Sequence, residues 1–351
     1  MTAAGQALSG DQTDEYSYGP GDVTPGILSL RIFAWAIVAA TFVFLISNYL
    51  VFWHGWPGIS SVLAIIGIED AKGTATSGLA WVQVLAYFGC LAVPAAYVFS
   101  TRQRSLRRDS AKMNAIVAYI IRAAFWAVLI VGLVDMIISF LRVEGLLESV
   151  VGADLTQQLG RSQFRGPYVH LPLIGLSLII AAFTRTLGFT WLALLVVVAE
   201  LQIVIARFIF SYEQAFMGDL VRFWYAALFL FASAYTLYEE GHVRVDVLYA
   251  RFAPKTKGIV NALGSLLLGI SLCIVILGVG MGGKSSIINA PLLNFEVSQS
   301  GFGMYVKYLM AGFLAVFSVS MMVQFAAYVL EGAADYRGDP GTRELDADII
   351  H

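Results

Sequence analysis

The polar residues with the most regular spacing lie in the segment GHVRVDV, residues 241–247. After Gly241, the residues His242, Arg244 and Asp246 follow at intervals of two and alternate with valines. In an extended chain this spacing places the three polar side chains on one face, whereas an α-helix would scatter them. Arg244 can bind Asp246 or the carbonyl groups at a helix end through its planar fork of donors. The pattern predicts that these three residues fix the shape of a turn or hold a partner of that turn. The alternative is a direct role in ion movement.

A second pair of charges lies inside a strongly apolar run. Glu200 and Arg207 are seven residues apart, two turns of an α-helix, and therefore share one helical face. A charge in the hydrocarbon of a membrane is costly and needs a partner or an exit to the surface. We expect an intramembrane ion pair between them that fixes packing. The alternatives are that Arg207 pairs with Glu213 or Asp219, and that Glu200 binds a coupling ion.

Two further charges fall within apolar runs. Arg122 lies two to three turns from the end of its run, so its long side chain is expected to reach the membrane surface. Asp135 lies about two turns from the other end of the same run. We expect Asp135 to make a helix-cap or interhelical hydrogen bond.

Other patterns that carry chemistry do not occur in the sequence. It has no phosphate-binding glycine and lysine loop, no HExxH and no paired cysteines, and Cys90 and Cys273 are expected to be small buried hydrophobes. We therefore expect no catalytic residue, no metal, no cofactor and no enzymatic activity. The net charge of −2 gives no basic bias toward nucleic acid. All four histidines fall in loops or at expected span ends, where they form no pair of haem ligands: His54, His170, His242 and His351.

The composition places these residues in a membrane. Hydrophobic residues make up 58% of the 351 residues and charged residues 13%, far from the balance of soluble domains. The break TRTLG, residues 184–188, predicts a tight helical hairpin, with one long bent helix as the alternative. The expected fold is an all-α, polytopic membrane helical bundle of about eight spans. The predicted spans are residues 30–53, 79–99, 114–141, 168–184, 187–210, 220–238, 259–283 and 303–331.

Basic residues predict the orientation of this bundle. Lysines and arginines crowd the loop TRQRSLRRDSAK at residues 101–112 and the segment 244–257, which fall on the same side of an eight-span chain. Because such residues stay on the cytoplasmic side, both ends of the chain are expected inside the cell. Residues 1–29 then form a disordered cytoplasmic tail, and residues 332–351 a second cytoplasmic tail.

The order of polar residues in the second half resembles a known family. It is similar to the DctQ-like small permease subunit of tripartite ATP-independent periplasmic (TRAP) transporters, in the branch labelled mannitol or chloroaromatic type. Asp219 departs from the glutamate usual at its position but keeps the charge. In this resemblance residues 187–331 are the four-span core and residues 30–186 are an N-terminal four-span extension. The matching residues are Arg207 with Phe208 and Phe210, Asp219, Gly241, His242, Arg244, Asp246, Glu296 and Ser298, with Lys307 entering the last span.

The resemblance implies a function and partners. Such a subunit is a scaffold that braces a large permease subunit during sodium-coupled uptake of an organic acid or similar solute, delivered by a periplasmic solute-binding protein. The expected surroundings are the lipid of a bacterial inner membrane. The alternatives are a stand-alone secondary transporter and a membrane-anchored assembly or accessory protein. The first four spans either add contact area for the large subunit or widen the scaffold against lipid.

Overall fold

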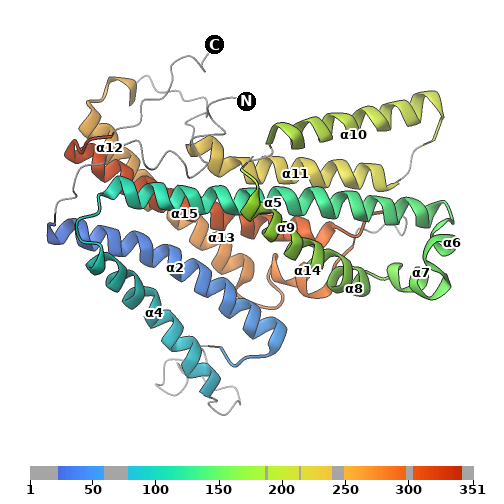
Figure 1. Ribbon diagram of the computed structural model, residues 1–351, viewed down its shortest axis with the longest axis horizontal. Coiled ribbons are helices and arrows are strands. Elements are labelled where there is room, and N and C mark those ends of the chain that lie inside the picture. The colour runs from blue at the N-terminus through green and yellow to red at the C-terminus, as the bar shows by residue number, and fades with distance from the viewer. Residues whose placement is uncertain are drawn as a thin grey trace. The chain divides into compact units, whose positions relative to one another are not determined.

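The computed structural model describes residues 23–58, 78–185, 189–212, 215–238, 249–297 and 303–341. Every regular element in these ranges is helical, which confirms the all-α prediction (Figure 1). The first half contains α2 (Pro25–His54), α4 (Gly78–Ser100), α5 (Leu106–Val143), α6 (Leu147–Val151), α7 (Ala153–Leu159), α8 (Ser162–Arg165), the π-helical turn η2 (Gly166–His170) and α9 (Leu171–Phe183). The second half contains α10 (Phe189–Ile209), α11 (Ala215–Tyr238), η3 (Tyr249–Arg251), α12 (Pro254–Gly264), η4 (Ser265–Ile270), α13 (Ser271–Met281), α14 (Asn289–Asn294) and α15 (Lys307–Arg337).

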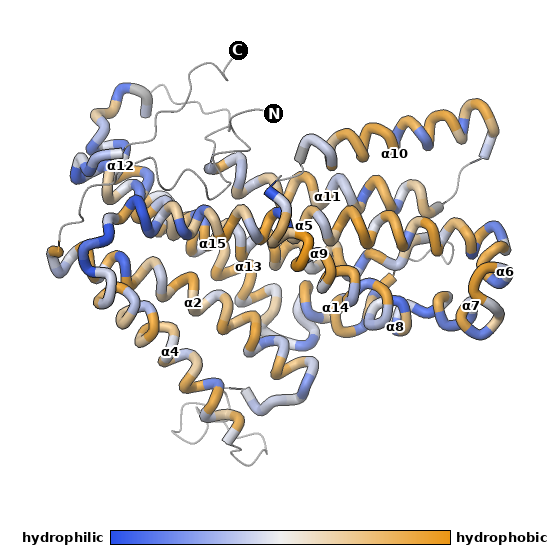
Figure 2. Tube along the Cα trace, in the orientation of Figure 1, coloured by the Kyte–Doolittle hydropathy of each residue, from blue (hydrophilic) through white to orange (hydrophobic). Residues whose placement is uncertain are grey.

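Eight helical spans in the described residues are long and apolar enough to cross a membrane, as predicted. Hydrophobic residues run along most of the length of these helices, and hydrophilic residues gather towards their ends (Figure 2). The chain is therefore a multi-pass membrane protein. The spans are Pro25–His54, Gly78–Ser100, Leu106–Val143, Ser162–Phe183, Thr190–Ile209, Phe216–Tyr238, Pro254–Met281 and Lys307–Arg337.

Several spans extend beyond their predicted ends. Helix α2 begins at Pro25 and α15 continues to Arg337, so each takes in residues that were assigned to a tail. Proline is favoured in the first turn of a helix because its missing N–H has no partner there in any case. Helix α5 begins at Leu106, so most of the basic segment 101–112 is helical rather than a loop. Hydropathy marks the apolar stretch of a helix, whereas polar turns continue it outside the membrane.

The break between α9 and α10 is a true helix end. Thr184 has the extended backbone angles φ −94° and ψ 148° after the last residue of α9. Its hydroxyl oxygen accepts a hydrogen bond from Nε1 of Trp126 at 3.0 Å. One long bent helix is therefore excluded, and the chain makes two separate helices here, as the hairpin prediction requires.

The described residues pack into two compact units. The first contains the described residues of 116–238 and 276–320, and the second those of 23–115, 249–275 and 321–341. Each unit thus combines residues from before and after position 187. The domain boundary expected near residue 187 stays a prediction.

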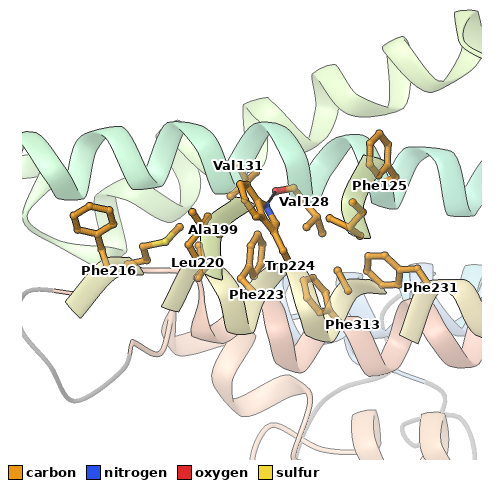
Figure 3. Close-up of a cluster of buried hydrophobic side chains, with 14 residues drawn as sticks. Phe125, Val128, Val131, Ala199, Phe216, Leu220, Phe223, Trp224, Phe231 and Phe313 are labelled. Atoms are coloured by element: carbon orange, nitrogen blue, oxygen red, sulfur yellow. Dashed lines mark hydrogen bonds between the residues drawn. The ribbon is translucent and has the colours of Figure 1, made fainter. Parts of the chain in front are cut away.

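The core of the first unit lies between α5, α10, α11 and the start of α15. Helix α11 points large aromatic residues inward at helical spacing, and Trp224 donates a hydrogen bond from Nε1 to the carbonyl oxygen of Val128 at 3.3 Å (Figure 3). Packing of this kind holds membrane helices together by van der Waals contact, since lipid is as apolar as the core itself. The fully packed residues are Phe125, Val128, Val131, Leu192, Ala199, Phe216, Leu220, Phe223, Trp224, Ala227, Phe231, Met304, Val306 and Phe313.

The second unit contains two close helix pairs. Helices α2 and α4 lie side by side (Figure 1). Helices α12 and α15 approach so closely at Gly258 and Gly332 that a Cβ atom on Gly258 would lie 2.5 Å from the carbonyl oxygen of Gly332. Small residues permit such backbone contact between membrane helices.

Candidate functional site

The most deeply buried charges of the first unit gather around Asp135 of α5. The side chains of Asp135, Arg165 in α8 and His170 in η2 are fully buried. Oδ1 of Asp135 accepts hydrogen bonds from Nη1 of Arg165 at 2.7 Å and from Nε2 of His170 at 3.0 Å. Its Oδ2 accepts a third hydrogen bond from the backbone N–H of Tyr305 at 2.8 Å. One carboxylate therefore joins α5, the segment from α8 to η2, and the residues just before α15. We call this group the Asp135 clamp.

Arg165 supplies most of the remaining contacts of the Asp135 clamp. Its Nε donates to the carbonyl oxygen of Leu159 at 2.9 Å, and its Nη1 also donates to Oγ of Ser139 at 3.2 Å. The guanidinium lies 4.2 Å from the centre of the Tyr305 ring, within the range of a cation–π contact. Because the charges of Asp135 and Arg165 cancel, burial of the pair avoids the cost of an unpaired charge.

A π-helical turn brings Arg165 and His170 to the same carboxylate. Residues five apart in an α-helix point about 140° away from each other. The turn η2 has π-helical hydrogen bonds, which wind the chain more loosely and bring such residues closer to one face. Pro167 and Pro172, which cannot donate backbone hydrogen bonds, lie in and just after this turn. The local irregularity thus creates the binding geometry for Asp135.

His170 extends the Asp135 clamp to α15. Its Nδ1 lies 2.8 Å from the hydroxyl of Tyr308, and the two rings are stacked at an angle of 14°. A carboxylate can only accept, so Nε2 of His170 carries the proton of the bond to Asp135, and Nδ1 pairs with the hydroxyl of Tyr308. The side chains of Asp135, Arg165 and His170 are fully buried and Tyr308 is 2% exposed, so none of these four reaches the surface. The arrangement favours fixing helices over binding a solute.

Phe295 and Tyr305 complete the packing around the Asp135 clamp. Phe295 adopts the left-handed conformation, with φ 47°, at the end of α14. Its ring lies against Gly166, where any Cβ atom would clash with it, and edge-on to Tyr308 at 5.2 Å. The hydroxyl of Tyr305 donates to the carbonyl oxygen of Gly160 at 2.8 Å. The segment before α15 is therefore held by side-chain packing as well as by the carboxylate.

A second buried ion pair lies in the second unit. Nε of Arg31 in α2 donates to Oδ2 of Asp109 in α5 at 2.6 Å, and both side chains are fully buried. The remaining nitrogens of Arg31 donate to the carbonyl oxygen and hydroxyl of Thr101, each at 3.0 Å. Arg31 therefore fixes the start of the first span to the segment between α4 and α5.

Arg107 forms a further contact in this unit. Its Nη2 donates to Oδ1 of Asp335 at 2.8 Å, and its Nε donates to the carbonyl oxygen of Pro340 at 3.0 Å. In the same unit, Nε2 of Gln324 donates a hydrogen bond to Oδ1 of Asn114 at 3.1 Å. Arg107, one of the basic residues used to predict orientation, thus also binds the end of α15. This contact accounts for the continuation of α15 past residue 331.

The sequence prediction for Asp135 is confirmed, because it makes interhelical hydrogen bonds. The prediction for His170 is wrong, since this residue is buried inside a span that begins at Ser162 rather than at residue 168. The prediction for Arg122 is also wrong. Only 8% of Arg122 is exposed, and its Nε and Nη1 are buried without a hydrogen-bond acceptor among the described residues.

The structure does not bring Glu200 and Arg207 together. Both side chains are exposed on α10, and within the described ranges neither forms an ion pair with the other. Asp219 forms an ion pair with Arg222 instead, with Nη1 of Arg222 at 3.6 Å from Oδ1 of Asp219. Glu213 lies outside the described residues.

Two other expected residues make defined contacts. Oδ2 of Asp219 accepts a hydrogen bond from the backbone N–H of Met304 at 3.1 Å, which links α11 to the segment before α15. Glu296 binds Nζ of Lys307 at 2.5 Å, and both side chains are about half exposed, 45% and 48%. The remaining predicted residues lie outside the described residues: Gly241, His242, Arg244, Asp246 and Ser298.

Within the described residues, no group of three or more histidine, cysteine, aspartate or glutamate side chains has an arrangement that could hold a metal ion. The polar contacts of the second half join neighbouring segments: Asp219 in α11 binds Met304, and Glu296 after α14 binds Lys307 at the start of α15. Residues 193–335 match the family model of tripartite ATP-independent periplasmic transporters, DctQ component. No curated protein and no solved structure matches the chain.

The DctQ region, residues 193–335, begins in α10 and ends in α15. The family that it matches is a transporter component. Tyr305 and Tyr308 belong to it, whereas Asp135, Arg165 and His170 lie before it. The Asp135 clamp therefore binds the DctQ region to the part of the chain that precedes it. The sequence offered no signal for this contact beyond the need of a buried aspartate for a partner.

Proposed function

We propose that this chain is the small integral-membrane subunit of a TRAP-type secondary active transporter. In this proposal it braces a large permease subunit during sodium-coupled uptake of an organic acid or a similar solute, which a periplasmic solute-binding protein delivers. The observation that carries the proposal is the match of residues 193–335 to the DctQ component. The assignment to the mannitol or chloroaromatic branch, to a bacterial inner membrane and to an orientation with both ends inside forms part of the same proposal.

The buried contacts support a scaffold rather than a moving part. Helices that change their packing during transport need alternative partners for every buried polar group. In the Asp135 clamp, the Asp135 carboxylate has three donors, and Arg165 has partners on three sides. Breaking such a group would leave charges unpaired in an apolar interior. A subunit that resists deformation is what a brace for a moving permease requires.

The same contacts favour one role for the N-terminal four-span extension. Asp135, Arg165 and His170 come from residues 30–186, and they bind Tyr305 and Tyr308 of the DctQ region. The core of the first unit likewise draws on α5 as well as on α10 and α11. We infer that the extension enlarges and stiffens one scaffold instead of forming an independent module.

Affinity purification tests the proposal. The tagged chain is expressed from its native operon, extracted in a mild detergent and purified, and the proteins that accompany it are identified by mass spectrometry. We expect a larger multi-span permease in roughly stoichiometric amount. A tagged, unrelated membrane protein of the same host, purified in parallel, controls for non-specific recovery.

Two results would contradict the proposed function. If the chain purifies alone and moves solute after reconstitution into proteoliposomes, it is a stand-alone transporter and the scaffold proposal fails. If it purifies alone without transport, and the large permease is present in the same membranes, the proposed association also fails.

A further inference from the structure

Glu200 is a charged residue in the middle of a span and on the outside of its helix bundle. Ten residues of the span Thr190–Ile209 precede it and nine follow it, which places it about 14 to 15 Å from either end of the helix. A glutamate side chain is too short to reach the membrane surface from there. Glu200 is nevertheless exposed, and it has neither a hydrogen bond nor an ion pair with any residue that the structure describes.

Most of the surface of helix α10 is not buried by the rest of the described chain. Only 17% of its apolar stretch is buried, the smallest share among the eight spans of the described residues, whereas 72% is buried for Lys307–Arg337. Its inner side is the row Leu192, Ala199 and Ala206, at intervals of seven residues, which are all buried. The rest of α10 therefore faces either lipid or another protein.

The two charges lie on one flank of this helix. Glu200 follows Ala199 by one position and so points about 100° away from the buried row. Arg207 is seven residues further and shares this flank to within about 20°. Val204 lies between them and is 48% exposed. We call Glu200, Val204 and Arg207 the charged flank of α10.

Contact with lipid does not stabilise the charged flank. A carboxylate at mid-span has no partner in acyl chains, and its exposure there is costly unless another protein supplies a counter-charge or hydrogen-bond donors. Charged residues within spans almost always face the interior of a helix bundle and pair with one another or with backbone carbonyls. Burial on the partner's surface would remove Glu200 from lipid and give it that partner.

We propose that the charged flank of α10 is the docking surface for a transmembrane helix of the large permease subunit. That helix carries a lysine, arginine or histidine near mid-membrane opposite Glu200, and a hydrogen-bond acceptor or carboxylate nearer the membrane surface opposite Arg207. Charge complementarity selects this occupant over lipid. The inference rests on the proposed function for the existence of the large subunit, and it adds the surface and the chemistry of the contact.

Photo-crosslinking in intact membranes tests the position of the docking surface. Val204 is replaced by p-benzoylphenylalanine in one variant, and Val198 in a matched control. Val198 is also a valine of α10 and is 50% exposed against 48% for Val204, but it points about 120° away. We expect illumination to link the chain to the large permease from position 204 and to give no such product above background from position 198.

Substitution of Glu200 tests the charge. Glu200→Gln keeps the shape of the side chain, and Glu200→Lys reverses its charge. Both are expected to reduce the large permease recovered with the tagged chain by about tenfold or more, the scale on which loss of one member of a buried interfacial charge pair weakens protein complexes. Gln202→Ala removes an exposed polar side chain from the other flank of α10 and should leave recovery unchanged.

The outcomes of these experiments distinguish failure of the docking surface from failure of the proposed function. If the parent chain recovers the large permease but position 198 crosslinks to it as strongly as 204, or Glu200→Gln has no effect, the docking surface is wrong and the proposed function stands. Crosslinking of position 204 to a second copy of this chain also overturns the docking surface. If the parent chain recovers no large permease at all, the proposed function fails and the docking inference fails with it.

Discussion

Removal of the charge from Asp135 is the most direct test of the Asp135 clamp. The variant Asp135→Asn preserves the size of the side chain. One amide oxygen can still accept from Arg165 and His170, but the new NH2 group then faces the backbone N–H of Tyr305, which donated at 2.8 Å to the carboxylate. Two donors would oppose each other, and the guanidinium of Arg165 would lose its counter-charge.

The expected loss of stability follows from these contacts. Breaking a buried ion pair by removing one partner costs about 3–5 kcal/mol. Arg165 retains the carbonyl oxygen of Leu159, the hydroxyl of Ser139 and the ring of Tyr305, which moderates the loss. We therefore expect Asp135→Asn to lower the free energy of unfolding by about 3 kcal/mol, the lower end of that range.

A second substitution should rescue part of this loss. Arg165→Met in the Asp135→Asn background removes the unpaired charge and keeps an apolar side chain of similar length. Neutral replacements of both members of a buried pair are often tolerated. The double variant should be about 1–2 kcal/mol more stable than Asp135→Asn alone, since buried partners do not add independently. Asp154→Asn, at an exposed acid of α7, is the control and should change stability by less than about 0.5 kcal/mol.

The free energy of unfolding can be measured by titration with sodium dodecyl sulfate in mixed micelles, with tryptophan fluorescence as the signal. Trp224 lies in the core of the first unit and reports on its packing. The reasoning would be refuted by an Asp135→Asn variant within about 1 kcal/mol of the parent chain, well below the cost of an unpaired buried charge. A double variant that is less stable than the single one would refute it equally.

Three further perturbations have expected outcomes in the same assay. Arg31→Met leaves Asp109 as a buried charge without its partner and should cost about 3–5 kcal/mol; a change below about 1 kcal/mol would show that the pair does not fix the first span. Gly258→Ala places a Cβ atom against the carbonyl oxygen of Gly332, so α12 and α15 must separate. We expect the free energy of unfolding to fall by about 1–3 kcal/mol. An unchanged stability would contradict the close approach of the two helices. Arg122→Met removes two buried nitrogens that lack acceptors among the described residues, and should leave stability unchanged or raise it by about 1 kcal/mol; a loss above about 2 kcal/mol would reveal a partner for Arg122.

The sequence was informative where the signal is local. A membrane span is a run of apolar residues of fixed minimum length, so all eight spans were found from hydropathy alone. The ends of spans were less accurate, as at Leu106 and Arg337, because polar turns outside the membrane have no hydropathy signal. The order of polar residues in the second half pointed to the family that the DctQ match also gives.

Contacts between polar residues were predicted less well from the sequence. Glu200 and Arg207 share a helical face, and the spacing rule predicted that they would pair, but their side chains remain apart. Helical spacing limits which residues can meet and does not say which of them have a better partner elsewhere. Arg165 falls outside the predicted spans, although it is fully buried against Asp135.

The amino-acid sequence by itself therefore determined that this protein is a multi-pass helical membrane protein with a DctQ-like second half, because apolar length and residue order are properties of the chain. Only the tertiary structure decided that Asp135, Arg165 and His170 meet Tyr305 and Tyr308. The hydrogen bonds among them join residues up to 170 positions apart, and a π-helical turn sets their geometry. Long-range pairing of this kind depends on how helices pack, and in an apolar solvent it is the buried charges that make one packing much better than another.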